Sequence, residues 1–262
     1  MHIGVSTSCF YPALTEDAAQ RLQTAGVQYL ELFLNTFSEI EPGYLNALKS
    51  QLDATGARAL AFHPFTSSME PFFFATSYER RFADGVAMYR RLFEAAALVG
   101  AKIFNFHGDY KASPYPFELY CEHFARLADI AAEYGILLSQ ENVVRCKSGS
   151  IENIRKMRAL LGDKAHFTLD LKQAVRSEVS PEEMLDAMGD SLCHLHISDH
   201  TAQQDCLAPG AGQFDFEDFF QKLHWRGYQG NAVIELYRGN FAEMANLLQG
   251  LRYLETVTAK TF

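Results

Sequence analysis

The stretch CHLHISDH, Cys193 to His200, has the apolar character of a short buried strand but carries several histidines. Residues two positions apart in a strand share a face, so His194 and His196 point the same way. A buried strand that places two imidazoles on one inward face predicts a functional site. The rest of the chain is then expected to bring further side chains to His196.

Similar strand-like runs alternate with amphipathic helical runs along the whole chain, which is typical of βα units. The runs predicted as strands are IGVSTSC (3–9), YLELFL (29–34), ALAFH (59–63), KIFNFH (102–107), ILLSQEN (136–142), HFTLD (166–170), CHLHISDH (193–200) and NAVIELY (231–237). Eight units in 262 residues give about 33 residues each, the repeat of a (β/α)8 barrel. A doubly wound open sheet normally has a glycine-rich turn after its first strand, where this chain reads SCFYPAL. We therefore predict the α/β class and a single (β/α)8 TIM barrel that forms one domain, residues 1–262.

The composition of the chain argues against several classes of binding partner. The formal net charge of −9 argues against nucleic acid, whose binding depends on clustered lysines and arginines. Met1 leads directly into the first strand, and no apolar run is long enough to cross a bilayer. The five cysteines are scattered and show no C-x-x-C spacing. We expect a cytoplasmic protein with reduced thiols that acts on a small molecule, with no membrane or nucleic-acid partner.

Ionisable residues occupy the last inward position of seven predicted strands. Chemistry in this fold collects at the carboxyl ends of the strands, where inward and outward side chains alternate. The seven residues are Glu31, His63, His107, Glu141, Asp170, His196 and Glu235. Unpaired buried charges are costly, whereas a ring of carboxylates and imidazoles is tolerable around a cation.

Four of these residues come from consecutive strands and therefore share one arc of the rim: Glu141, Asp170, His196 and Glu235. Three carboxylates and one imidazole suit a divalent cation, with Mn²⁺ expected first and Mg²⁺, Co²⁺ or Zn²⁺ as alternatives. A cation that prefers six ligands keeps two positions for substrate oxygens. A sugar or polyol ketone, with neighbouring hydroxyl and carbonyl groups, would fill both.

Five phrases carry a resemblance to a known superfamily: QEN, TLD, HLHISD, PGAG and IELY. With them the chain resembles the xylose isomerase-like barrels, which include sugar isomerases, ketose 3-epimerases, inosose dehydratase and endonuclease IV. The resemblance implies that the four arc residues match the metal ligands of the superfamily. In its epimerase branch, the residues that match Glu141 and Glu235 also serve as acid and base.

The departures from endonuclease IV argue against DNA repair. That branch has D-x-x-H on the sixth strand, where this chain has Asp170-Leu-Lys-Gln173, and D-x-H in the loop after the seventh, where this chain has Asp205-Cys206-Leu207. Two of the histidines of a three-metal nuclease are therefore missing. Together with the negative charge, this favours the sugar branches.

The expected reaction is removal of a proton next to a ketose carbonyl, through an enediolate that the cation stabilises. Glu141 or Glu235 would act as the general base. If one glutamate removes the proton and the other returns it, the centre is epimerised; if one does both, the carbonyl moves. Dehydration of an inosose on the same site, and a metal-loaded barrel that binds sugar without turnover, are the alternatives.

Further residues are candidates for substrate binding: His63, His107, Glu31, Lys172 and Arg238. Glu31 would either bind substrate or orient His63, and ion pairs with neighbouring carboxylates are the alternative for Lys172 and Arg238. The loop PFTSSMEPFFFATS, residues 64–77, is rich in phenylalanine. Such apolar density predicts a lid at an oligomer contact, which leaves a homodimer or a tetramer open.

Overall fold

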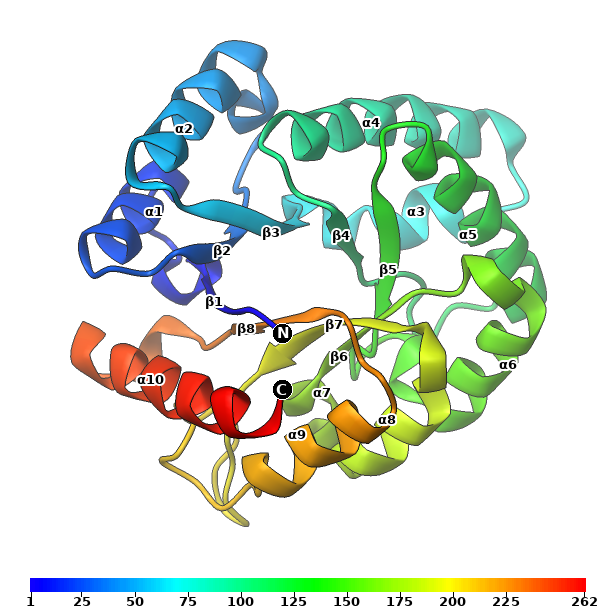
Figure 1. Ribbon diagram of the computed structural model, residues 1–262. Helices are drawn as coiled ribbons and strands as arrows, with labels where there is room; N and C mark the ends of the chain where they lie inside the picture. Colours follow the sequence, from blue (N-terminus) through cyan, green and yellow to red (C-terminus); the bar gives the residue numbers. More distant parts are fainter.

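Eight parallel strands form a closed barrel in the computed structural model, which describes residues 1–262. The strands follow chain order, and β1 pairs with β8 to close the barrel. Figure 1 shows them at the centre of the molecule with the helices around them. The strands are β1 Ile3–Ser6, β2 Tyr29–Phe33, β3 Arg58–His63, β4 Ile103–Phe106, β5 Leu137–Glu141, β6 Phe167–Asp170, β7 Leu192–Ile197 and β8 Asn231–Ile234. The predicted (β/α)8 TIM barrel is thus confirmed.

Ten α-helices surround the strands, two more than a minimal barrel needs. The additional ones are α3 after β3 and α7 after β6, and the sequence reading did not predict either. The helices are α1 Thr15–Thr24, α2 Pro42–Thr55, α3 Glu70–Phe74, α4 Glu79–Leu98, α5 Phe117–Ala132, α6 Ile151–Leu161, α7 Leu171–Arg176, α8 Pro181–Met188, α9 Phe216–Trp225 and α10 Met244–Thr261. None of them combines the length and the apolar character that a membrane crossing requires.

Local sequence signals explain where several helices begin and end. Ser180 caps α8 in a capping box with Glu183, and Pro181 occupies the first turn, where its missing N–H costs nothing. Gly56 ends α2 with a φ of 72°, a left-handed conformation that glycine adopts without strain. These signals place the βα connections where the pattern predicted them.

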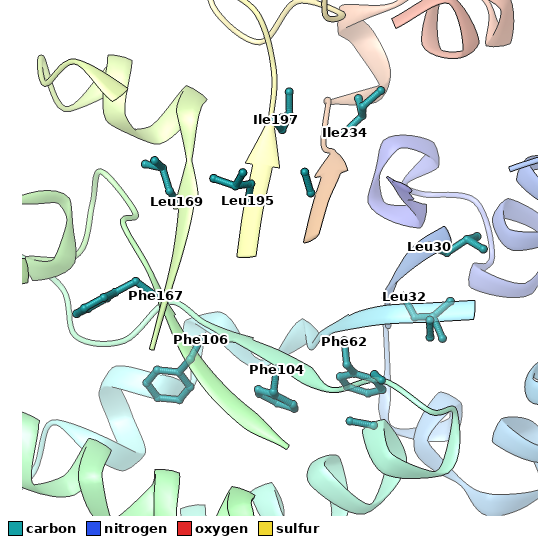
Figure 2. Packing of buried hydrophobic residues seen from close by; sticks show 14 of the residues in the cluster. Leu30, Leu32, Phe62, Phe104, Phe106, Phe167, Leu169, Leu195, Ile197 and Ile234 are labelled. Atoms are coloured by element: carbon teal, nitrogen blue, oxygen red, sulfur yellow. The ribbon is translucent and has the colours of Figure 1, made fainter. Parts of the chain in front are cut away.

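Alternation along the strands separates an apolar outer layer from a polar barrel interior. Figure 2 shows strand residues such as Leu32, Phe104 and Leu195 among the buried apolar cluster, which contains 67 residues. The alternate residues of each strand face the barrel interior. They include Glu31, Asn105, Thr168 and His194, all fully buried. Barrel interiors are usually filled by branched aliphatic side chains. A polar interior instead requires a hydrogen-bonded network, which lies directly below the site.

Register places the site residues at one end of the barrel. The β6–β7 ladder shifts by one residue between Phe167 and Thr168, after which Asp170 pairs with His196. Strand β8 ends at Ile234, which pairs with Ile197, so Glu235 is the first residue beyond the strand. The predicted eighth strand, 231–237, therefore overran the observed one by three residues, because the chain turns at the rim.

Candidate metal centre and active-site cavity

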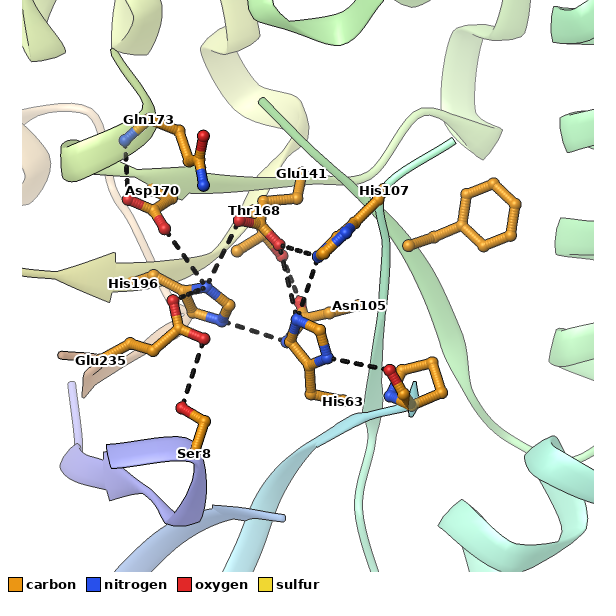
Figure 3. Close-up of polar contacts among 12 residues, drawn as sticks. Ser8, His63, Asn105, His107, Glu141, Thr168, Asp170, Gln173, His196 and Glu235 are labelled. Atoms are coloured by element: carbon orange, nitrogen blue, oxygen red, sulfur yellow. Dashed lines mark hydrogen bonds and ion pairs between the residues drawn. The ribbon is translucent and has the colours of Figure 1, made fainter. Parts of the chain in front are cut away.

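The four arc residues meet at the carboxyl end of the barrel. Glu141 closes β5, Asp170 closes β6, His196 is the fifth residue of β7, and Glu235 follows β8. Parallel neighbouring strands bring such terminal residues to one rim. One possible ligand atom from each residue lies within 4.8 Å of the others. Figure 3 shows the three carboxylates around the His196 ring.

The Nδ1 atom of His196 is directed at these carboxylates. It lies 3.4 Å from Glu235 Oε2, 3.8 Å from Glu141 Oε1 and 3.9 Å from Asp170 Oδ2. Buried polar atoms normally have hydrogen-bond partners, yet His196 Nδ1 has none. Carboxylate oxygens and an imidazole nitrogen are a donor set for Mn²⁺, Mg²⁺, Co²⁺ or Zn²⁺. The donor set and the unpartnered Nδ1 atom therefore fit a divalent cation.

A carboxylate on the other side of the ring fixes the orientation of His196. Glu31 Oε2 lies 2.9 Å from His196 Nε2, and the Asn105 amide donates a hydrogen bond to the same oxygen. Burial alone would raise the pKa of Glu31, but His196 and His194 outweigh it and hold the pKa below its usual value. A carboxylate on the far nitrogen leaves Nδ1 free for a metal.

The layer beneath the site is a chain of polar side chains across neighbouring strands. Thr168 Oγ1 donates to Asn105 Oδ1 at 2.7 Å, and the Ser139 hydroxyl lies 2.7 Å from the same Thr168 oxygen. Our sequence reading did not single out these three residues. Each lies two positions before a rim residue, so the alternation that identified the rim could also have found this layer.

Asp170 is held by its own strand end and by the helix that follows. Its Oδ1 accepts the backbone N–H of Gln173 at 3.0 Å and so caps α7. The Asn142 side chain bonds the backbone N–H and C=O of Asp170, joining the ends of β5 and β6. Burial raises the pKa of Asp170 to about 6, although Lys172 opposes the shift.

Two histidines stand beside Glu141. His107 Nε2 lies 3.1 Å from Glu141 Oε2 and 3.1 Å from His63 Nε2, and His63 Nε2 is 3.8 Å from the same carboxylate oxygen. Burial opposes charge on His107, but Glu141 and Glu70 outweigh it and raise the pKa of this imidazole. Burial and His107 lower the pKa of His63. This pair of imidazoles is a route by which a proton can reach or leave Glu141.

A buried glutamate that the sequence reading missed holds His107 in place. Glu70 Oε2 accepts the backbone N–H groups of His107 and Gly108 at 2.8 Å and 2.7 Å, and its Oε1 accepts the Tyr89 hydroxyl at 3.1 Å. Burial raises the pKa of Glu70 to about 7. Glu70 lies in a loop-derived helix, so no strand alternation pointed to it.

A cavity of about 230 Å³ opens over the site. Aromatic and aliphatic groups form part of its wall, and charged and polar groups form the rest. The lining residues are Ser8, Tyr11, Phe33, His63, His107, Glu141, Val143, Arg145, Lys172, Gln173, Glu235, Leu236 and Tyr237. Mixed walls of this kind suit a small molecule with both apolar and hydroxylated faces.

Three of the five residues predicted for substrate binding line this cavity: His63, His107 and Lys172. Glu31 does not, because it is fully buried beneath His196, and its partner is His196 rather than His63. Arg238 is also absent from the wall, since its guanidinium donates to the Phe241 carbonyl at 3.0 Å. For Glu31 and Arg238 the expectation of substrate contact does not agree with the structure.

The phenylalanine-rich segment is partly core. Phe74 is 1% exposed and packs on Tyr89 with ring centroids 4.8 Å apart, whereas Phe72 is 54% exposed under the Arg81 guanidinium. No residue of 64–77 lines the cavity in this structure. Closure of this segment over the pocket stays a prediction. A contact with a second copy of the chain stays a prediction.

Comparisons with known proteins give matches over nearly the whole chain. The family model described as xylose isomerase-like TIM barrel matches residues 19–257. An uncharacterized protein of Mycobacterium leprae (strain TN) is 22% identical over 259 residues, covering 89% of this chain and 88% of the relative. The structure of D-psicose 3-epimerase with D-tagatose, from Clostridium cellulolyticum H10, has a TM-score of 0.80 at 14% identity, with 100% and 99% of the two chains covered. The IOLI protein with a bound zinc atom has a TM-score of 0.76 at 16% identity, with 100% and 99% covered.

Proposed function

Since the chain belongs to the xylose isomerase-like TIM-barrel family, we propose that it is a metal-dependent isomerase or epimerase of a sugar or sugar phosphate. One observation carries this proposal: Glu141, Asp170, His196 and Glu235 converge from four consecutive strands, with their ligand atoms within 4.8 Å. The structural neighbours include D-psicose 3-epimerase, which supports the same reaction class.

The four residues would hold one divalent cation, with Mn²⁺ as our first choice. Oxygen ligands and a single imidazole favour Mn²⁺ over an ion that requires thiolates, and the zinc atom of the IOLI protein supports a first-row metal. When bound, the cation supplies Lewis acidity that stabilises negative charge on a substrate oxygen. Glu31 holds His196 so that its Nδ1 is available to that cation.

The side chains of Glu141 and Glu235 are our candidates for proton transfer. They come from β5 and from the residue after β8, so two strands of the arc separate them. Glu141 Oε2 lies 3.1 Å from His107 Nε2, which would carry the proton to and from this glutamate. Glu235 instead contacts Lys172 Nζ at 2.9 Å and Ser8 Oγ at 3.4 Å. Removal of a proton by one glutamate and its return by the other gives an epimer; transfer by one of them gives an isomer.

The cavity wall supports a sugar as the substrate class. Tyr11 and Phe33 offer apolar surface to the C–H face of a carbohydrate. His63 and His107 lie on the same wall and can hydrogen-bond to hydroxyl groups. A small ketose satisfies both kinds of contact at once.

Deuterium exchange tests this function. Metal-loaded protein is incubated in D₂O with ketoses, ketose phosphates and inositol ketones, and the recovered compounds are examined by mass spectrometry and proton NMR after removal of protein and metal. We expect deuterium at one carbon next to the carbonyl. Loss of hydroxyl with exchange would identify a dehydratase instead.

Two variants and a control test the roles of the individual glutamates. Glu141→Gln and Glu235→Gln should bind the sugar but exchange at least about 100-fold more slowly, because a neutral amide cannot accept the proton. Glu255→Gln, an exposed position on α10, serves as the matched control. Normal exchange in both variants, or sugar binding without exchange in any protein, would count against the proposal.

A further inference from the structure

Lys172 is a buried lysine whose ammonium group lies between two of the proposed ligands. It is the second residue of α7, and its side chain is 2% exposed. Its Nζ lies 2.7 Å from Asp170 Oδ2 and 2.9 Å from Glu235 Oε2. Both oxygens belong to the group of ligand residues whose carboxylates surround His196 Nδ1.

The ammonium group forms no ion pair with any other carboxylate. The ring of Tyr237 lies 5.3 Å from Lys172 Nζ, and Arg176, the next cation along, is bound to Asp205 and to the Tyr237 hydroxyl. Lys172 also lines the cavity from which a cation or a substrate would reach the site. Two carboxylates of the site are therefore the fixed anionic partners of this lysine.

The Lys172 ammonium group and a divalent metal ion would bind the same carboxylates. A divalent ion gains its binding free energy from the negative charge of Asp170, Glu141 and Glu235, and a nearby positive charge reduces that gain. Without any cation, by contrast, three clustered carboxylates, two of them buried, would repel one another. A lysine between two of them relieves this repulsion before a metal arrives.

We propose that Lys172 is a tethered competitor of the divalent cation, which holds Asp170 and Glu235 together in the metal-free protein and lowers the affinity of the site for metal. This inference rests on the proposed metal-dependent function. It adds that Lys172 regulates the site by keeping metal binding weak and reversible. The ammonium must loosen its hold on at least one carboxylate when the ion binds.

A purely structural ion pair makes the opposite prediction. If Lys172 only stabilises the fold around its carboxylates, its removal misplaces these ligands and weakens metal binding. If Lys172 competes, its removal strengthens metal binding while the metal-free protein becomes less stable. Affinity and stability then move in opposite directions, which no merely structural residue produces.

The experiment measures Mn²⁺ binding to chelator-stripped protein by calorimetry and by the electron paramagnetic resonance of free Mn²⁺. Lys172→Met and Lys172→Gln remove the charge, and Lys172→Arg retains it. Lys222→Met, which removes a half-exposed lysine of α9 paired with Asp218, is the control. We expect the two neutral variants to bind Mn²⁺ at least about tenfold more tightly, and the other two within about threefold of the natural protein. Melting temperatures should fall for the stripped neutral variants and rise more steeply with Mn²⁺.

The outcomes separate this inference from the proposed function. Unchanged or weaker Mn²⁺ binding in both neutral variants, with one ion per chain in the natural protein, overturns the inference alone. Binding to Lys172→Met but not to the natural protein supports it in its strongest form. No binding of Mn²⁺, Mg²⁺, Co²⁺ or Zn²⁺ by any of the proteins overturns both proposals. Should the neutral variants fail to fold when stripped, recovery on refolding with Mn²⁺ supports the competition and failure to recover contradicts it.

Discussion

His196 Nε2 lies 2.9 Å from Oε2 of Glu31, although the two residues are 165 positions apart in the chain. One contact thus joins β2 to β7 across the barrel interior and turns the other ring nitrogen toward three carboxylates. A carboxylate on the far nitrogen of a metal-binding histidine fixes both its tautomer and its orientation. Glu31 is therefore expected to act on the metal through His196, without touching the substrate.

The first prediction concerns Glu31. In Glu31→Ala, Mn²⁺ affinity should fall about 10–100-fold, because His196 loses its partner; Glu31→Gln should fall less, since its amide oxygen still accepts the Nε2 proton. Calorimetric titration measures both. Glu39→Ala, which removes a buried carboxylate bound to Thr15 and Asn35, is the control and should leave Mn²⁺ affinity unchanged. Equal affinities of Glu31→Ala and the control would contradict this assignment.

The second prediction concerns pH and Glu70. Burial raises its pKa in the folded protein to about 7 from an ordinary value of 4.5, so the fold favours the protonated carboxyl. Its contribution to stability is therefore complete below about pH 4.5 and is lost as the pH rises toward 7, by up to about 3 kcal/mol. Glu70→Gln lacks this titration.

Urea denaturation at pH 5 and pH 8 tests the Glu70 prediction. The free energy of unfolding of the natural protein should decrease relative to Glu70→Gln between the two pH values. The exposed Glu152→Gln on α6 should show no such relative change. A constant difference between the natural protein and Glu70→Gln would mean that the amide donors of His107 and Gly108 keep Glu70 ionised throughout.

The third prediction separates core from surface in the phenylalanine-rich segment. Phe74→Ala should lower the free energy of unfolding by about 3–5 kcal/mol, because the ring is buried against Tyr89 and Phe106. Phe72→Ala should change it by no more than about 1 kcal/mol, since this ring is mostly exposed. Denaturation of the two variants, with analytical ultracentrifugation, distinguishes the cases. Dissociation of an oligomer by Phe72→Ala would support the predicted contact between copies, and a large loss of monomer stability would argue that Phe72 packs more tightly than the structure indicates.

The barrel and the rim residues could be predicted because both follow from strand periodicity. The alternation of inward and outward side chains gives the last inward position of each predicted strand. This position is His196 on the seventh strand and Glu141, Asp170 and Glu235 on the fifth, sixth and eighth, and no distance is needed to find it. The same rule also places Asn105 and Thr168 on the inward face, one layer below the rim. Small polar side chains among apolar neighbours, however, do not by themselves indicate a functional site. What periodicity fixes is the face of a strand on which a residue lies.

Residues outside the strands could not be placed in this way. Lys172 and Arg238 each lie close to a rim carboxylate in sequence, yet α7 turns Lys172 into the site while the chain after β8 turns Arg238 toward Phe241. Glu70 reaches the backbone of His107 only because α3 packs beside the end of β4. Such directions depend on loop conformation and tertiary packing, which local sequence does not encode.

The position of a bound ion tests the central claim most directly. Crystals grown with Mn²⁺ and measured near the manganese absorption edge should show one strong anomalous peak per chain, bounded by Glu141, Asp170, Glu235 and the Nδ1 atom of His196. A peak instead among His63, His107 and Glu141, which also bring their ligand atoms within 4.8 Å of one another, would contradict the account, as would protein that binds no ion at all.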